Sequence, residues 1–188
     1  MAGLIENLKQ GNASAFKDMV HTCKDMVYNT AIGILQNPED AEDVTQEVFM
    51  QVYESISSFK GEALLSTWLY RITVTKSLDH LKKKNRKKRW AKITSLFGAG
   101  GETLVESADF HHPGVTLANK ERSVLLFKAL ARLPENQKAV FVLHKLEGLS
   151  AKDIAAVMDI SLASVEGLMH RAKAGLRSQL EKYYREDD

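Results

Sequence analysis

The sequence predicts an all-α fold in which two small helical domains are joined by a flexible linker, with a helix-turn-helix in the second domain. Apolar residues recur at helical spacing through most of the 188 residues. The chain has only three prolines and few runs of β-branched residues. Residues 95–117 break the pattern, because they hold four glycines and a proline and show no periodicity.

The first domain is predicted to span residues 1–94 and to begin with a long helix over residues 13–36. Its apolar positions follow the helical period, and Asn37 and Pro38 end it, because the residue before a proline disfavours helical backbone.

A second helix is expected from Pro38, because a proline and acidic residues in the first turn favour a helix start. One buried stripe runs along it at four-residue spacing: Val44, Val48, Val52 and Ile56. A polar break with a glycine, residues 57–62, separates it from a third helix that starts near residue 63 and continues into a basic cluster. In this helix Trp68 has core spacing with its apolar neighbours.

The second domain is predicted over residues 118–188. Its four helices are expected near residues 118–133, 135–146, 150–158 and 162–183, separated in part by Pro134 and Gly148.

The clearest local motif lies in this domain. Ser150 and Asp153 form a capping-box pattern at a helix start, a short turn follows at residues 159–161, and buried apolar positions return in the next helix. This pattern is typical of a helix-turn-helix, whose second helix enters the major groove of DNA. The residues that would face DNA are Ser161, Ala163, Ser164, Gly167, His170, Arg171 and Lys173.

Charge is strongly segregated along the chain, although the net charge is only +2. Residues 25–59 contain seven acidic residues and neither Lys nor Arg, whereas residues 82–92 contain eight basic residues and no acid. Such segregation suggests two different partners, one basic and one polyanionic.

Several classes of protein are not supported. The first residues lack the apolar core of a secretory signal, and no apolar stretch approaches the length of a membrane span, so we expect a cytoplasmic protein. A lone cysteine, Cys23, fits a reducing compartment. No set of titratable groups has catalytic spacing, and no metal site or cofactor motif is found, so an enzyme is the least supported class.

Motifs in both predicted domains resemble extracytoplasmic-function (ECF) sigma factors. Their region two is similar to the stretches DAEDVTQEVF (40–49), FKG (59–61), STWLYRI (66–72) and DHLK (79–82). Their region four is similar to ALARLPE (129–135), LS (149–150) and HRAK (170–173). The resemblance covers both domains and skips the linker.

The resemblance implies a dissociable specificity subunit of bacterial RNA polymerase, regulated by a cognate anti-sigma factor. Residues for binding core polymerase would be Asp40, Asp43, Gln46 and Glu47. Residues for recognising and melting the −10 element, by capture of non-template bases, would be Phe59, Lys60, Gly61, Tyr70, Arg71, Thr75, Lys76, Lys82, Lys83 and Arg86. The helix-turn-helix would read the −35 element.

Two other functions remain open on the residues alone. A stand-alone repressor or activator would use the helix-turn-helix without polymerase, but leaves the acidic segment without a purpose. A helical adaptor that does not bind DNA is disfavoured by the basic cluster and the helix-turn-helix.

Overall fold

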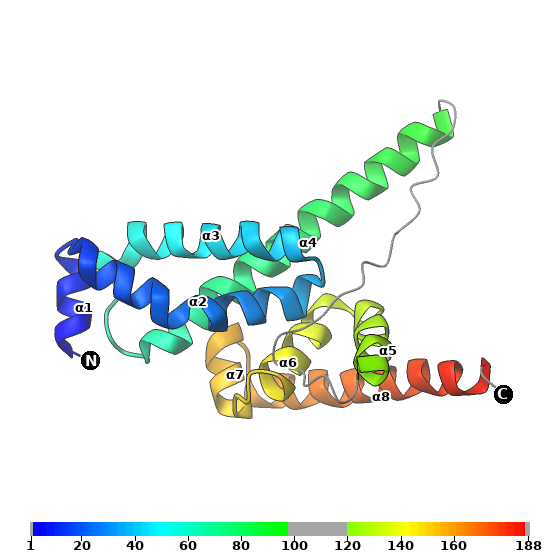
Figure 1. Cartoon of the computed structure of the whole chain (residues 1–188). Coiled ribbons are helices and arrows are strands. Elements are labelled where there is room, and N and C mark those ends of the chain that lie inside the picture. Colours follow the sequence, from blue (N-terminus) through cyan, green and yellow to red (C-terminus); the bar gives the residue numbers. More distant parts are fainter. Residues whose placement is uncertain (1, 98–119, 187–188) are drawn as a thin grey trace.

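The computed structural model describes the backbone of residues 2–97 and 120–186 (Figure 1). These ranges contain no strand, and the all-α prediction is confirmed. The elements are α1 (Ala2–Lys9), α2 (Ala13–Leu35), α3 (Pro38–Ser55), a short 3-10 turn η1 (Ile56–Ser58), α4 (Leu65–Phe97), α5 (Lys120–Ala131), α6 (Glu135–Lys145), α7 (Ala151–Met158) and α8 (Leu162–Glu186).

Helices α1 to α4 form the N-terminal unit, in which α2, α3 and α4 pack on one another. The starts of α2 and α3 are fixed locally: the side chain of Asn12 accepts from the Ala15 amide at 3.1 Å, and that of Asn37 accepts from the Asp40 amide at 2.8 Å. The predicted valine stripe of α3 is fully buried, as its four-residue spacing indicated.

The ends of the N-terminal unit differ from the prediction. Helix α1 was not predicted from its short sequence; Leu8 is buried in the core and Leu4 and Ile5 pack beside it. Helix α4 continues to Phe97, so the predicted linker over residues 95–117 begins with the last residues of this helix. The rest of that predicted linker, residues 98–117, lies outside the described residues.

Helices α5 to α8 form the C-terminal unit, and α7 and α8 make the predicted helix-turn-helix. The capping box is present: Ser150 Oγ accepts from the Asp153 amide at 3.2 Å, and the Asp153 carboxylate accepts from the Ser150 amide at 3.3 Å. Asp159 takes a left-handed backbone with φ of 55°, and the Ile160 amide donates back to the carbonyl of Ala155 at 3.1 Å. This left-handed residue turns the chain from α7 into α8.

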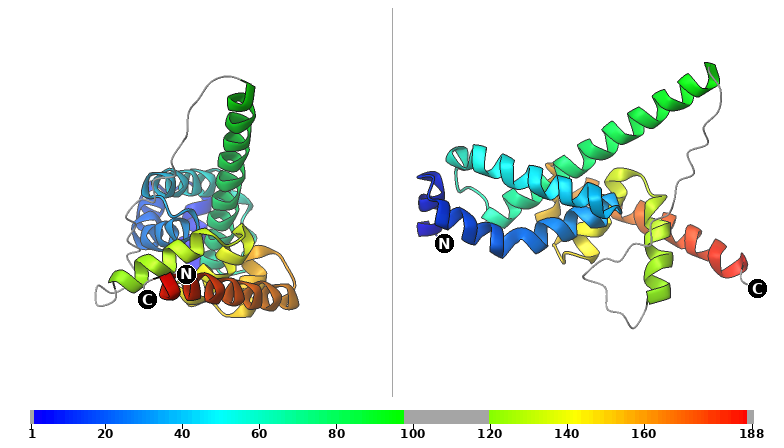
Figure 2. Two further views of the ribbon diagram at one scale, coloured as in Figure 1. Left: turned by 90° about the vertical axis from the view of Figure 1, so that its right-hand side faces the viewer. Right: turned by 45° about the horizontal axis from the view of Figure 1, so that its top comes forward.

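The two units pack against each other. Helix α7 lies on α4, and α6 lies on α2 (Figures 1 and 2). Ile34 of α2 and Val74 of α4 are buried in one apolar cluster with residues of α6, α7 and α8. The C-terminal part of α4, which carries the basic cluster, extends beyond the other helices (Figures 1 and 2).

The left-handed turn of the helix-turn-helix can be tested at Asp159. Asp159→Val should lower the free energy of unfolding by about 1–2 kcal/mol, because a β-branched side chain clashes in this conformation, whereas Asp159→Gly should not lower it. Lys152→Val, at an exposed position of α7 with ordinary helical geometry, is the control. Urea unfolding followed by circular dichroism measures the difference, and equal effects of the two valines would contradict the prediction.

Candidate polymerase and nucleic-acid interfaces

The acidic surface of α3 is partly neutralised by α4. The Asp40 carboxylate is paired with His80 Nε2 at 3.1 Å and with the ammonium group of Lys84, and its side chain is only 18% exposed. Glu47 lies 3.6 Å from Lys76 Nζ. Two of the four residues predicted to bind polymerase therefore have charged partners within the chain.

Asp43 and Gln46 remain exposed on α3, and an apolar groove of about 620 Å³ lies beside Gln46, between α2 and α3. Met50 and Tyr53 are 63% and 59% exposed in it. The groove is lined by Phe16, Val20, Lys24, Thr45, Gln46, Phe49, Met50, Tyr53 and Glu54. The groove was not predicted from the sequence, although Met50 and Tyr53 are large apolar residues outside the valine stripe of α3.

The loop before α4 places the first residues predicted to bind the −10 element. Gly61 has φ of 76°, a conformation that favours glycine, and Lys60 and Gly61 are exposed. Phe59 is only 6% exposed, and its ring packs on Trp68 with centroids 5.1 Å apart. Phe59 is thus buried beneath this loop, and Trp68 packs against the core as its spacing predicted.

Tyr70 and Arg71, in the second turn of α4, contact the C-terminal unit. The Tyr70 hydroxyl donates to Glu147 Oε2 at 3.1 Å, and Arg71 Nη2 donates to the backbone carbonyl of Ala156 at 2.5 Å. Burial raises the pKa of Tyr70, and the adjacent Glu147 raises it further. Burial also raises the pKa of Glu147 itself, and hydrogen bonds with Tyr70 and Thr30 offset part of that rise.

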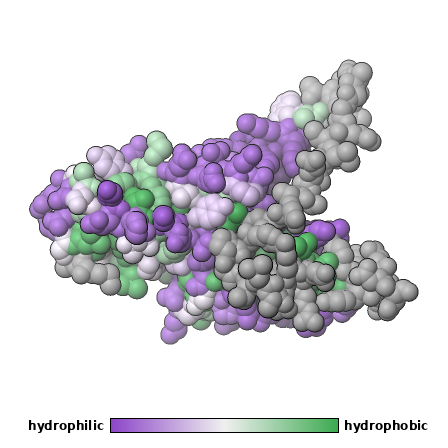
Figure 3. Space-filling model, in the orientation of Figure 1, coloured by the Kyte–Doolittle hydropathy of each residue, from purple (hydrophilic) through white to green (hydrophobic). Residues whose placement is uncertain are grey.

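The remaining residues predicted to bind the −10 element follow along α4. Thr75, Lys83 and Arg86 are exposed, Lys76 is half-buried against Glu47, and Lys82 pairs with Asp79 at 3.2 Å. Figure 3 shows mainly hydrophilic residues on α4 where it leaves the other helices. This arrangement presents a row of cations suited to phosphate contacts, which are insensitive to sequence.

The residues predicted to bind the −35 element lie along the first half of α8. All are exposed except Gly167, which is half-buried. Ser161 Oγ accepts from the Ser164 amide at 3.2 Å and so caps the helix start. The Arg171 guanidinium lies beside Gly167, and its Nη1 is 3.5 Å from where a Cβ would stand, an ordinary van der Waals distance.

Comparison with known proteins agrees with this geometry. Residues 19–87 match sigma-70 region 2, and residues 121–176 match sigma-70 region 4. The chain is 32% identical to the ECF RNA polymerase sigma factor SigW of Bacillus subtilis, with 94% of each chain covered. It is 30% identical to the ECF RNA polymerase sigma-E factor of Haemophilus influenzae, over 95% of this chain and 94% of that one. The chain belongs to the ECF sigma factors.

Two solved structures share the fold. CnrH in complex with the cytosolic domain of CnrY superposes with a TM-score of 0.66 at 23% identity, over 95% of this chain and 96% of that one. The sigma factor RpoE in complex with the anti-sigma factor NepR, from Bartonella quintana, superposes with a TM-score of 0.63 at 22% identity, over 88% and 96%. At these identities, both comparisons show that the arrangement of helices is shared.

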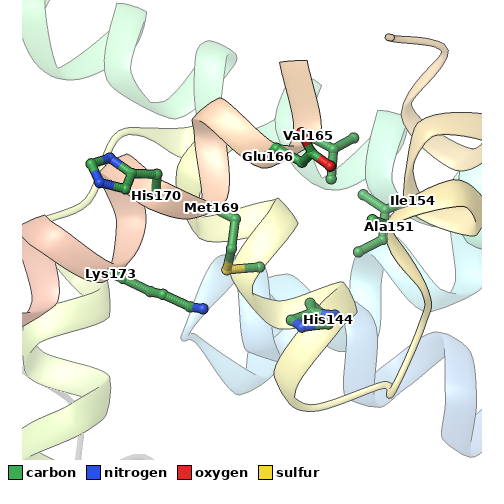
Figure 4. A pocket seen from close by; sticks show the side chains of 8 residues that line it. All are labelled: His144, Ala151, Ile154, Val165, Glu166, Met169, His170 and Lys173. Atoms are coloured by element: carbon green, nitrogen blue, oxygen red, sulfur yellow. The ribbon is translucent and has the colours of Figure 1, made fainter. Parts of the chain in front are cut away.

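A small pocket of about 240 Å³ lies inside region 4 of this sigma factor (Figure 4). Met169 points into its centre, and His170 and Lys173, both predicted to contact DNA, line it together with His144. His144 Nδ1 lies 2.9 Å from the carbonyl oxygen of Leu149, which fixes the ring beside the start of α7.

Within residues 3–91 and 124–181, no group of His, Cys, Asp and Glu could hold a metal ion. No helix in the described part of the chain is long and apolar enough to cross a membrane. Cys23 is half-buried and packs against the core, and burial raises the pKa of its thiol, as expected for a core thiol.

The raised pKa of Glu147 predicts a pH effect on stability. The folded chain binds the Glu147 proton more tightly than the unfolded chain does, so protonation of Glu147 stabilises the fold. This stabilisation is complete below the ordinary glutamate pKa of about 4.3 and is lost as the pH rises through the raised pKa of the folded chain. Glu147→Gln mimics the protonated form and can still accept from Tyr70.

This variant should therefore melt at a higher temperature than the wild type at neutral pH, and the two should converge near about pH 4. Calorimetry across this range measures the effect, with the exposed Glu62→Gln as the control. A lower melting temperature of Glu147→Gln at neutral pH would show that the ionised carboxylate stabilises the fold.

Proposed function

We propose that this ECF sigma factor is a dissociable, non-catalytic specificity subunit that acts in the cytoplasm, where it binds core RNA polymerase and directs transcription initiation to its promoters. The observation that carries the proposal is the separation of three surfaces on one small chain. Acidic and apolar groups face outward on α3, cations and an aromatic residue lie on α4, and the exposed face of a helix-turn-helix lies on α8.

Polymerase would bind at α3. Asp43 and Gln46 are exposed there, and Met50 and Tyr53 offer apolar area in the neighbouring groove. In an interface with an apolar centre and charged margins, burial of the apolar side chains supplies affinity, and the charges fix how the two proteins align. By resemblance, the partner would be a coiled coil of the largest catalytic subunit, with basic and apolar side chains on its surface.

Promoter opening would use α4 and the loop before it. Unstacking a base pair costs about 1–2 kcal/mol per step, and an aromatic side chain that stacks on a freed base returns about 1–3 kcal/mol. Tyr70 is the aromatic residue of the predicted set that could stack on a base, because Phe59 is buried. Lys82, Lys83 and Arg86 would hold the phosphates beside the opened segment.

The −35 element would be read by α8. Its N-terminal half is exposed and carries Arg171 and Lys173, which can contact guanine edges or phosphates.

A cognate anti-sigma factor would regulate the chain. Support comes from the similar fold of RpoE, which was solved in complex with the anti-sigma factor NepR. Such an inhibitor would bind across the same helices that polymerase and promoter DNA require.

The polymerase surface is tested by charge reversal at Asp43, which makes no ion pair with another side chain of residues 3–91 and 124–181. Asp43→Lys should weaken holoenzyme formation by roughly tenfold or more, because it places a like charge against a basic partner, while the melting temperature stays unchanged. Competition for core polymerase against a labelled wild-type chain gives the affinity. Glu181→Lys, at an exposed position near the end of α8, is the matched reversal, and equal affinities of the two variants would place the polymerase surface elsewhere.

The −35 surface is tested at Arg171. Arg171→Ala should weaken binding of holoenzyme to duplex promoter DNA by about 1–3 kcal/mol, since it removes a base or phosphate contact, and should spare transcription from a premelted template. Lys128→Ala, exposed on α5, serves as the control. Equal loss on duplex and premelted templates would show that Arg171 has a structural role.

A further inference from the structure

An acidic residue lies in the middle of the face of α8 that is predicted to read DNA. Val165 and Ala172 are buried, so their side of the helix packs on the C-terminal unit and the opposite side faces solvent. Glu166 is exposed on the solvent side, and Ala163 and His170, three residues before it and four after it, share its face. A helix that enters the major groove with this face forward carries the carboxylate to the base edges.

No side chain of the described part of the chain engages the Glu166 carboxylate in an ion pair or a hydrogen bond. Figure 4 shows it apart from His170 and Lys173, the two basic residues of α8 in that view. The Arg171 guanidinium lies beside Gly167, the residue after Glu166. An available acceptor and a cation therefore lie close together on the surface that would face the groove.

The major groove offers a carboxylate few partners. Guanine and thymine present only hydrogen-bond acceptors there, O6 and N7 of guanine and O4 of thymine, and these repel a carboxylate. Adenine offers its N6 amine but places the N7 acceptor beside it, whereas cytosine offers its N4 amine with no acceptor next to it. The phosphates on both sides of the groove repel the negative charge as well. A carboxylate on this face therefore weakens binding unless it meets a cytosine amine.

We propose that Glu166 determines specificity at the −35 surface: its carboxylate accepts from the N4 amine of one cytosine, so the promoters of this sigma factor carry a C·G pair at that position of the −35 element. The neighbouring Arg171 adds a positive charge that offsets the repulsion between Glu166 and the phosphates. This inference rests on the proposed function, because it takes α8 as the −35 surface. It goes further in naming a base pair that this surface selects.

A selection with holoenzyme identifies the position of the base pair. Core polymerase with the wild-type, Glu166→Gln or Glu166→Ala chain selects duplexes from a library in which both promoter elements are randomised and the spacer length varies. The wild type should enrich C at one −35 position. Glu166→Gln should enrich A there, because an amide can bind both N6 and N7 of adenine, and Glu166→Ala should enrich no base there. Glu181→Gln, exposed near the end of α8, is the matched control and should select as the wild type does.

Competition binding to the selected duplex then isolates the contact to one amine. The cytosine is replaced by 2-pyrimidinone, which lacks only the N4 amine and still pairs with guanine. This replacement should weaken binding of the wild-type holoenzyme about tenfold and should hardly change binding of the Glu166→Ala holoenzyme. A structural role would not show this dependence, because loss of the favourable interaction between an acid and the start of α8 would lower affinity for every sequence alike.

Two results would overturn this inference and leave the proposed function standing. One is identical base preferences of the wild-type and Glu166→Gln holoenzymes. The other is tighter binding of the Glu166→Ala holoenzyme to every sequence, which would show that Glu166 only repels phosphates. If the wild-type holoenzyme enriched no promoter element at all, the proposed function would be wrong, and the inference with it.

Discussion

The sharing of α4 between two packing partners is the constraint on which the rest of the structure depends. Leu69, Thr73 and Ser77 are fully buried along one face of this helix. Thr73 can be buried because its hydroxyl donates to the Leu69 carbonyl at 2.8 Å. A neighbouring face, with Tyr70 and Val74, packs on the C-terminal unit. Only the remaining face and the extending C-terminal part are left for solvent and charge.

Charge pairing between α3 and α4 decides how much of the acidic segment a partner can use. Asp40 is bound by His80 and Lys84, and Lys76 lies against Glu47. The acidic stretch in the sequence therefore overstates the negative surface that the folded chain presents. Under the proposed function, recognition at α3 would rely on a few exposed polar groups together with the apolar groove, and burial of that groove would supply affinity that weakly paired surface charges do not.

Local signals predicted most of the helices, whereas contacts between distant segments could not be predicted from the sequence. Asn37 with Pro38 marks a helix boundary, and Ser150 with Asp153 marks another, because capping involves neighbours in the chain. Helix α1 was missed because tertiary packing of Leu8 holds it. The resemblance that assigned Tyr70 to the −10 element held no sign of Glu147, since the two are 77 residues apart and meet only through the packing of α6 on α2 and of α7 on α4.

The contact between Tyr70 and Glu147 also limits how stable the docked arrangement can be. An ionised carboxylate is costly where burial raises its pKa, and the hydrogen bonds of Tyr70 and Thr30 to Glu147 offset only part of that cost. An apolar residue in place of Glu147 would avoid this cost. Burial of the apolar cluster therefore stabilises the packing of the two units on each other, and a charge on Glu147 opposes it.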